Sequence, residues 1–231
     1  LLSAWLLNGF ANGLPAGLFL LFVTYRIEAP ERAGLLLLLY FGAGLAGIPL
    51  WLAASRRFGK HRAWICAMVA SCAFFAAVPF LGAGDVIAFA AICVLTGACL
   101  GADLALPPSM QADVVDIDAR EMGRRRTGLY FGLWNIATKL ALALAIGIAF
   151  PLLELAGFAT GGGANGAWAL AALSGLYGVA PIACKLAAVA LMLRYGVAIA
   201  CHAMPPGPTE RTFDASTPVS DFRFGASDSR V

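Results

Sequence analysis

Six long apolar segments restrict what this chain can fold into. The segments are residues 1–25, 33–55, 63–84, 86–108, 127–153 and 166–193. A helix needs about 20 apolar residues to cross the ~30 Å of hydrocarbon in a bilayer, and lipid offers the backbone no hydrogen bonds. The runs are continuous and do not alternate as the strands of a membrane barrel do. We therefore predict an all-α membrane protein with six transmembrane helices.

Composition and charge exclude several other classes of protein. Hydrophobic residues make up 61% of the chain and charged residues 13%, against roughly 25% charged in a soluble domain. The net charge of +3 comes with no basic stripe interleaved with aromatics, so no nucleic-acid partner is expected. The six cysteines show no metal-ligand or CxxC spacing, which predicts small buried hydrophobes and no metal site.

The loops between the segments differ in their content of Lys and Arg. The basic loops are 56–62 and 111–126, together with the tail after 193; the other loops are 26–32, 82–85 and 155–167. The positive-inside rule places the basic set in the cytoplasm. We predict a multi-pass plasma-membrane protein, of a bacterial inner membrane, with a bundle over 1–200. The Pro- and Ser-rich tail, 201–231, is expected to be disordered and cytoplasmic.

Three of the segments each contain a single charge: Asp103, Lys139 and Lys185. Such a charge costs at least ~2.5–3.5 kcal/mol near the bilayer centre, so it usually faces a partner or a watery cavity. Lys139 lies about 18 Å into its segment at 1.5 Å per residue. Asp103 lies at a similar depth from the same face, which predicts that these two side chains pair on the central face of the bundle. The pair either lines the pathway of substrate and cation or only joins two helices. Lys185 is expected to pack or to face a cavity.

Other polar and small residues inside the segments have two possible roles. Asn8 and Asn12 are four residues apart and share a helix face, where they contact a substrate or bond to a neighbouring helix. Trp134 and Asn135 either flank a sugar ring or serve in packing. The glycines recur at close spacing: Gly42, Gly44 and Gly47; Gly97 and Gly101; Gly175 and Gly178. These glycines predict close helix packing.

The most distinctive stretch is 107–139, PPSMQADVVDIDAREMGRRRTGLYFGLWNIATK. It resembles the glycoside–pentoside–hexuronide:cation symporters, the melibiose-permease branch of the major facilitator superfamily. That family has A-D-x-x-D, then G-x-R-x-x-(G/S), then a lysine in the following helix. Residues 8–15, NGFANGLP, are similar to its seventh helix, and the loop sequence RFGK at 57–60 is similar to a superfamily loop signature.

The resemblance implies the carboxy-terminal half of a twelve-helix carrier. Its partner would be the amino-terminal six-helix half, with the substrate site between the halves near midplane. The family's cation site and most of its sugar-binding acids lie in that other half. The family lysine falls on Lys139, which the resemblance places beside the sugar and cation sites. Leu104 stands where the family can present a tryptophan to the sugar.

The basic and acidic loop residues predict a cytoplasmic gating network. Its members are Arg57, Gly59, Lys60, Asp113, Asp116, Arg124 and Arg126. A short amphipathic helix within 111–121 is expected to lie along the membrane surface with its acids towards 124–126. Asp113, Asp116 and Asp118 lack the Gly and closing Glu of a calcium-binding EF-hand loop.

The function that the sequence predicts is cation-coupled symport of a sugar or glycoside by alternating access. Na⁺ or H⁺ would be the coupling ion, and no cofactor is expected. No nucleophile motif or zinc-protease motif occurs, so the protein is not expected to be an enzyme and no catalytic residue is assigned. Because the chain begins at Leu1 inside an apolar run, we expect it to continue upstream. The alternative is a non-transporting six-helix scaffold or a truncated remnant.

Overall fold

A computed structural model describes residues 1–122, 127–160 and 165–202 of the chain. Helix α1 is Leu2–Tyr25, α2 is Ala33–Phe58, α3 is Lys60–Phe75, α4 is Val86–Met122 and α5 is Thr127–Leu155. The last span consists of α6 (Ala167–Ser174), a π-helical turn (Gly175–Val179) and α7 (Ala180–His202). The described residues contain six spans that are long and apolar enough to cross a membrane and no strand. The prediction of six membrane helices is confirmed. The expected disordered tail lies outside the described residues from 203 onwards.

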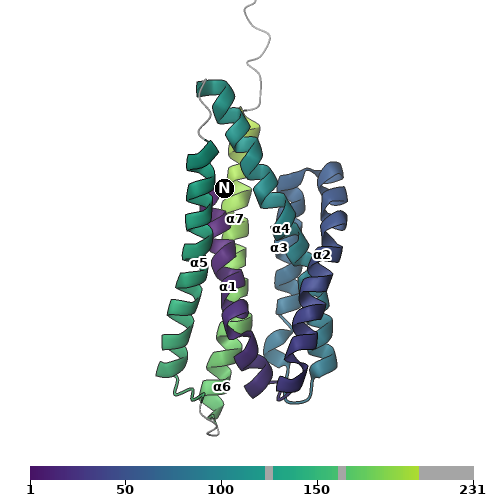
Figure 1. Ribbon diagram of the computed structural model, residues 1–231, viewed down its shortest axis with the longest axis vertical. Helices are drawn as coiled ribbons and strands as arrows, with labels where there is room; N and C mark the ends of the chain where they lie inside the picture. The colour runs from purple at the N-terminus through teal and green to yellow at the C-terminus, as the bar shows by residue number, and fades with distance from the viewer. Residues whose placement is uncertain (123–126, 161–164, 203–231) are drawn as a thin grey trace, which may run out of the picture.

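The helices form two groups that stand side by side (Figure 1). One group holds α1, α5 and α7, and the other holds α2, α3 and α4. Within the groups, α1 packs on α5 and α7, and α4 packs on α2 and α3. Contacts between α3 and α7 join the two groups. Helices that follow each other in sequence are therefore often not neighbours, and this determines which buried charges can meet.

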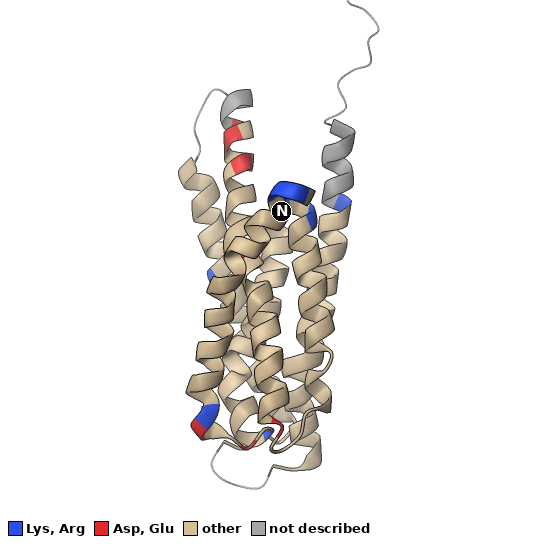
Figure 2. Ribbon diagram, turned by 90° about the vertical axis from the view of Figure 1, so that its right-hand side faces the viewer, with Lys and Arg blue, Asp and Glu red and all other residues tan. Residues whose placement is uncertain are grey.

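The connections between helices gather at the two ends of the bundle. The α2–α3 turn, the end of α4 and the start of α5 lie at one end, and the α1–α2, α3–α4 and α5–α6 connections lie at the other (Figure 1). Charged residues are concentrated at these two ends (Figure 2). This is the grouping that the loop charges predict. That the basic end faces the cytoplasm remains a prediction.

Helices α2 and α4 approach closely through glycines. A Cβ atom on Gly101 would lie 2.7 Å from the carbonyl oxygen of Gly44, and a Cβ on Gly97 would overlap the carbonyl of Tyr40. A Cβ on Gly47 would overlap the carbonyl of Ala98. In lipid, small residues allow the backbone contact that replaces a hydrophobic drive between helices. The predicted packing role is confirmed for Gly44, Gly47, Gly97 and Gly101, and it is wrong for Gly42 and Gly175, where an added Cβ would meet no atom within 4 Å.

Helix α5 is attached to the bundle along a single stripe. Its buried residues are Trp134, Ala137, Ala141, Ala145, Ala149 and Leu153. The alanines face glycines of α1, and a Cβ on Gly13 would lie 2.8 Å from that of Ala145. The other sides of α5 are exposed, so most of its surface is left for lipid or for another part of a larger protein.

Helix α4 continues without a break to Met122, although it contains Pro107 and Pro108. The prediction of a separate surface helix within 111–121 is therefore wrong. The prolines remove two backbone donors without ending the helix, and no glycine follows them before Gly123 to stop it. The expected contact of its acids with 124–126 lies outside the described residues.

The turn between α2 and α3 depends on Gly59, whose φ of 87° and ψ of 149° belong to a region that is essentially restricted to glycine. Gly59→Ala is expected to lower the free energy of unfolding by about 1–3 kcal/mol, the cost of one strained residue. SDS titration of the purified intact protein, followed by tryptophan fluorescence, measures the change. Gly34→Ala, in a helix and with no atom within 4 Å of the added Cβ, is the control. Equal stability of the two variants would contradict the strain.

Candidate functional site

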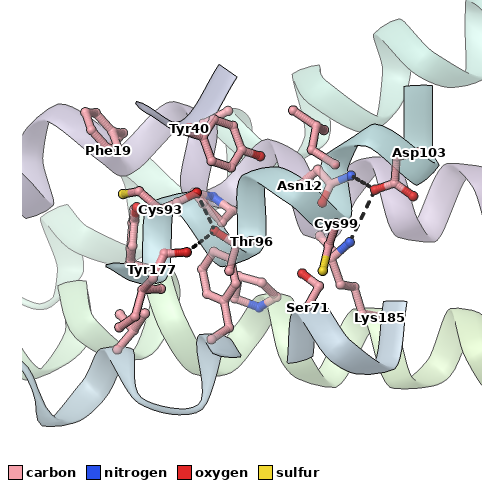
Figure 3. Close-up of a pocket in the computed structure, with 18 of the residues that line it drawn as sticks. Asn12, Phe19, Tyr40, Ser71, Cys93, Thr96, Cys99, Asp103, Tyr177 and Lys185 are labelled. Atoms are coloured by element: carbon pink, nitrogen blue, oxygen red, sulfur yellow. Dashed lines mark hydrogen bonds and ion pairs between the residues drawn. The ribbon is translucent and has the colours of Figure 1, made fainter. Parts of the chain in front are cut away.

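A buried polar cluster lies where the two helix groups meet. Asp103 on α4 is 7% exposed and Lys185 on α7 is 4% exposed. Asn8 and Asn12 reach the cluster from α1, and Trp64 reaches it from α3. Figure 3 shows Asn12, Asp103 and Lys185 converging from three different helices. The cluster therefore ties four helices of the bundle together through polar contacts.

The carboxylate of Asp103 accepts two short hydrogen bonds. The indole nitrogen of Trp64 donates to Oδ1 at 2.7 Å, and the amide of Asn12 donates to Oδ2 at 2.8 Å. The ammonium of Lys185 lies 3.5 Å from Oδ2 and donates to Oδ1 of Asn8 at 2.9 Å. Opposite charges and hydrogen bonds together offset the cost of removing both ions from water.

The predicted pairing of Lys139 with Asp103 is wrong. Lys139 is exposed on α5, and among the described residues no hydrogen bond or ion pair reaches it. The physical reason is helix adjacency, because α5 packs mainly on α1 and scarcely touches α4. Asp103 pairs instead with Lys185, whose helix is joined to α4 through α3 and α1.

The two asparagines share a helix face, as their spacing predicts, and both bond to neighbouring helices. The Nδ2 atom of Asn8 is buried without a partner among the described residues. Trp64 was not identified from the sequence, because nothing separates it from the other tryptophans. A general signal was present, since a buried indole N–H needs an acceptor and Asp103 is an acid in a neighbouring span.

Trp134 and Asn135 lie away from this cluster. Trp134 is buried against α1 and stacks on Trp5, with ring centroids 4.5 Å apart. Asn135 is exposed and donates to the carbonyl of Phe131 on its own helix. The structure therefore gives Trp134 a packing contact, and the predicted contact of both residues with a sugar remains a prediction.

A cavity of about 130 Å³ opens beside the cluster. Asn12, Ser71, Asp103 and Lys185 line its polar end (Figure 3). Its walls are mostly aromatic and aliphatic: Phe19, Leu37, Tyr40, Phe41, Phe75, Phe89 and Tyr177. Leu104, next to Asp103, points elsewhere and is 50% exposed. Pockets with apolar walls and a few convergent polar groups are typical of small-molecule sites.

The predicted cytoplasmic network is seen in part. Lys60 donates to Asp113 at 2.6 Å, which joins α3 to α4 at the basic end of the bundle. Arg57 lies over the ring of Phe58, Gly59 forms the turn and Asp116 is exposed. Arg124 and Arg126 lie outside the described residues. A gating role for this group remains a prediction.

Comparison with known proteins identifies the family. Residues 1–198 match the model of a family described as MFS/sugar transport protein. The chain is 29% identical over 200 residues to the sodium-dependent lysophosphatidylcholine symporter 1 of Homo sapiens, covering 85% of this chain and 36% of the relative. It is 28% identical over 164 residues to the sphingosine-1-phosphate transporter MFSD2B of Xenopus tropicalis, covering 69% and 31%.

A third relative is bacterial, the uncharacterized symporter sll1374 of Synechocystis, at 24% identity over 158 residues, or 68% of this chain and 29% of the relative. The chain thus spans about a third of the length of the curated relatives that it matches. All three are named as transporters or symporters. The family match covers every membrane span of the described bundle, so the chain belongs to the MFS/sugar transport family and forms a six-helix half-bundle of a major-facilitator transporter.

Proposed function

We propose that this chain is the second half of a cation-coupled symporter that moves an amphipathic solute by alternating access. The observation that carries this proposal is the cavity, which has a charged end and an aromatic wall. A cavity of this kind suits a molecule with a polar head and an apolar body. Na⁺ or H⁺ is the proposed coupling ion, with its site mainly in the other half.

The surface of α5 supports a missing partner. Lys139 and Asn135 are exposed on a helix whose only buried stripe faces α1. A charge in a membrane span normally faces protein or a watery cavity, because lipid contact is costly. An amino-terminal six-helix half on this side would give both residues such surroundings. The limited share of each relative that the chain covers agrees with this arrangement.

The relatives favour an amphipathic solute. Two of them are named for lysophosphatidylcholine and sphingosine-1-phosphate, molecules that join a polar head to a long apolar chain. The aromatic lining from Phe19, Phe89 and Tyr177 offers the apolar chain a matching surface. Symport requires that the cation and the solute stabilise a common state of the carrier, so that each raises the affinity for the other.

A sugar or glycoside is the second candidate. The family description names sugar transport, and the polar end of the cavity holds a carboxylate, an amide and an ammonium that can bond to hydroxyl groups. Aromatic rings such as Tyr40 also stack on sugar rings. An alkyl glycoside would use both the polar end and the aromatic wall.

Uptake by the intact carrier in proteoliposomes tests the proposal. Labelled lysophosphatidylcholine and an alkyl glucoside of equal chain length are each supplied under an imposed Na⁺ or H⁺ gradient. Uptake of the first that collapses with the gradient supports the amphipathic symporter, and uptake of the second alone supports the sugar candidate. No gradient-dependent uptake of either compound would favour the scaffold alternative.

Lys139→Ala is expected to lower kcat/KM for uptake in the intact carrier at least about tenfold, equivalent to about 1.4 kcal/mol. The reason is that a pathway charge is lost, while insertion into the membrane becomes easier without it. Initial uptake rates, corrected for the amount of carrier in the membrane, measure the effect. Ile136→Ala, also exposed on α5, is the control and should transport normally. Wild-type uptake by Lys139→Ala would remove Lys139 from the pathway.

A further inference from the structure

The cavity lies inside this half of the carrier, between its two helix groups. Its lining comes from α1, α2, α3, α4, α7 and the two short helical turns that hold Val78 and Tyr177, and none of it comes from α5, where the family lysine Lys139 lies. The cavity is therefore distinct from the exposed face of α5. Its polar end contains one ammonium, that of Lys185, at 4% exposure. A cavity needs only about 10–15 Å³ of this volume to hold one water, so its volume of about 130 Å³ admits an ionic head group together with part of an apolar chain.

The hydrogen bonds at the polar end are unevenly distributed. Both oxygens of Asp103 already hold short bonds from neutral donors, Trp64 and Asn12. The ammonium of Lys185 has three N–H groups but makes one short bond, to Asn8. Its distance of 3.5 Å to Asp103 exceeds the 2.7–3.2 Å typical of a direct hydrogen bond. Lys185 is thus the under-bonded member of the pair, and it faces the cavity.

The remaining free groups at this end are chiefly donors. Besides the spare N–H groups of Lys185, the Nδ2 of Asn8, which lies behind Lys185 and outside the cavity lining, has no partner among the described residues. Ser71, also in the lining, adds a hydroxyl. A cationic ligand group would meet the like charge of Lys185 and would find both oxygens of Asp103 already bonded, whereas a buried ammonium with spare N–H groups favours an anionic acceptor. The polar end is therefore suited to a negatively charged oxygen.

We propose that Lys185 binds an anionic oxygen, of a phosphate or a carboxylate, carried by an amphipathic ligand whose apolar chain lies along the aromatic wall of the cavity. This inference rests on the proposed amphipathic solute and adds the site and the charge of its head group. Asn8 and Asp103 position the ammonium. When the anion binds, Asp103 keeps its bonds from Trp64 and Asn12, so its carboxylate is not left without donors.

Protection of a native cysteine tests the site without requiring transport. Cys99 lines the cavity one helical turn before Asp103, and Cys66 lies on the exposed side of α3. Intact carriers that retain only Cys99 or only Cys66 are treated with methyl methanethiosulfonate. The modification rate is measured with octyl phosphate, octanoate, octyl glucoside or octyltrimethylammonium, each below its micelle concentration. We expect octyl phosphate or octanoate to protect Cys99 and none of the four to protect Cys66.

Variants at the ion pair give the decisive comparison. Lys185→Met should raise the octyl phosphate concentration needed for half protection at least about thirtyfold. The reason is that truncating one partner of a buried charge contact typically weakens binding by that factor or more. The neutral pair Asp103→Asn with Lys185→Met removes both charges together and should fold yet remain unprotected. Lys185→Arg should restore part of the protection.

Two outcomes overturn the inference. One is equal protection of the Lys185→Met and wild-type carriers by octyl phosphate, and the other is protection of wild type by octyl glucoside alone. A carrier that is protected by octyl phosphate but shows no gradient-driven uptake would retain this site and refute the proposed function. A carrier that transports solute, but whose Cys99 is not protected by either anion, would refute this site and leave the proposed function standing.

Discussion

Asp103→Ala is expected to lower the free energy of unfolding of the intact carrier by about 3–5 kcal/mol, because it leaves a buried ammonium without its counter-charge. Lys185 is 4% exposed, and among the described residues Asp103 is the acid that pairs with it. The same variant also removes the acceptor for Trp64 and Asn12. SDS titration of the purified carrier, followed by tryptophan fluorescence, measures the loss.

Two further variants test whether the stability loss of Asp103→Ala comes from the buried ion pair. Asp116→Ala removes an exposed acid from the same helix and should change stability by no more than about 0.5 kcal/mol. The neutral pair Asp103→Asn with Lys185→Met should recover most of the loss, since replacing both ions is far less costly than breaking the pair. If Asp103→Ala were as stable as Asp116→Ala, the buried pair would not exist in the folded carrier.

Gly97→Ala is expected to destabilise the carrier by about 1–3 kcal/mol or more, the usual cost of overpacking. The added Cβ would overlap the backbone carbonyl of Tyr40, and a carbonyl in a helix cannot rotate away as a side chain can. Helices α2 and α4 would have to separate along their whole contact. The unfolding midpoints of Gly97→Ala and of wild type measure the change.

The matched control lies on α2. A Cβ on Gly42 would meet no atom within 4 Å, so Gly42→Ala should be neutral or should gain up to about 1 kcal/mol of helix propensity. Both variants add the same methyl group to a helical glycine in an apolar span. Equal midpoints for the two variants would show that the α2–α4 contact is looser than described.

Hydropathy could predict the number of spans because span length is set by the thickness of the bilayer. The close packing at Gly97 and Gly101 was also predictable, since small residues at helical spacing permit backbone contact in lipid. The four-residue spacing of Asn8 and Asn12 correctly placed them on one helix face. These features depend on local sequence alone.

The partner of Asp103 could not be predicted in the same way. Depth from the basic end gave two candidates, because Lys185 precedes Arg194 by about as many residues as Asp103 precedes Asp113. The depth of a residue along its span determines its height in the membrane, but it does not determine which helix lies next to it. The prediction of Lys139 rested on matching depth and on adjacent spans, yet α5 packs on α1. The choice between the lysines depends on helix arrangement, which hydropathy does not encode.

The length of α4 was also underestimated. Apolar composition ends near Pro108, but the polar segment that follows continues the same helix to Met122. A pair of prolines normally marks the end of a helix, but α4 continues through both of them. The ion pair of Lys60 with Asp113 lies beyond the prolines and connects this extension to α3.

The wide sequence separation of Asp103 and Lys185 has a consequence during synthesis. Lys185 leaves the ribosome about 80 residues after Asp103, which is about 4–16 s at the usual ~5–20 residues per second. Throughout that interval the nascent chain holds a membrane acid without its cation. Asn12 and Trp64 precede Asp103 in the chain and supply its two short hydrogen bonds. These two neutral donors can therefore hydrogen-bond the carboxylate of Asp103 in the nascent chain until α7, which carries Lys185, has been synthesised.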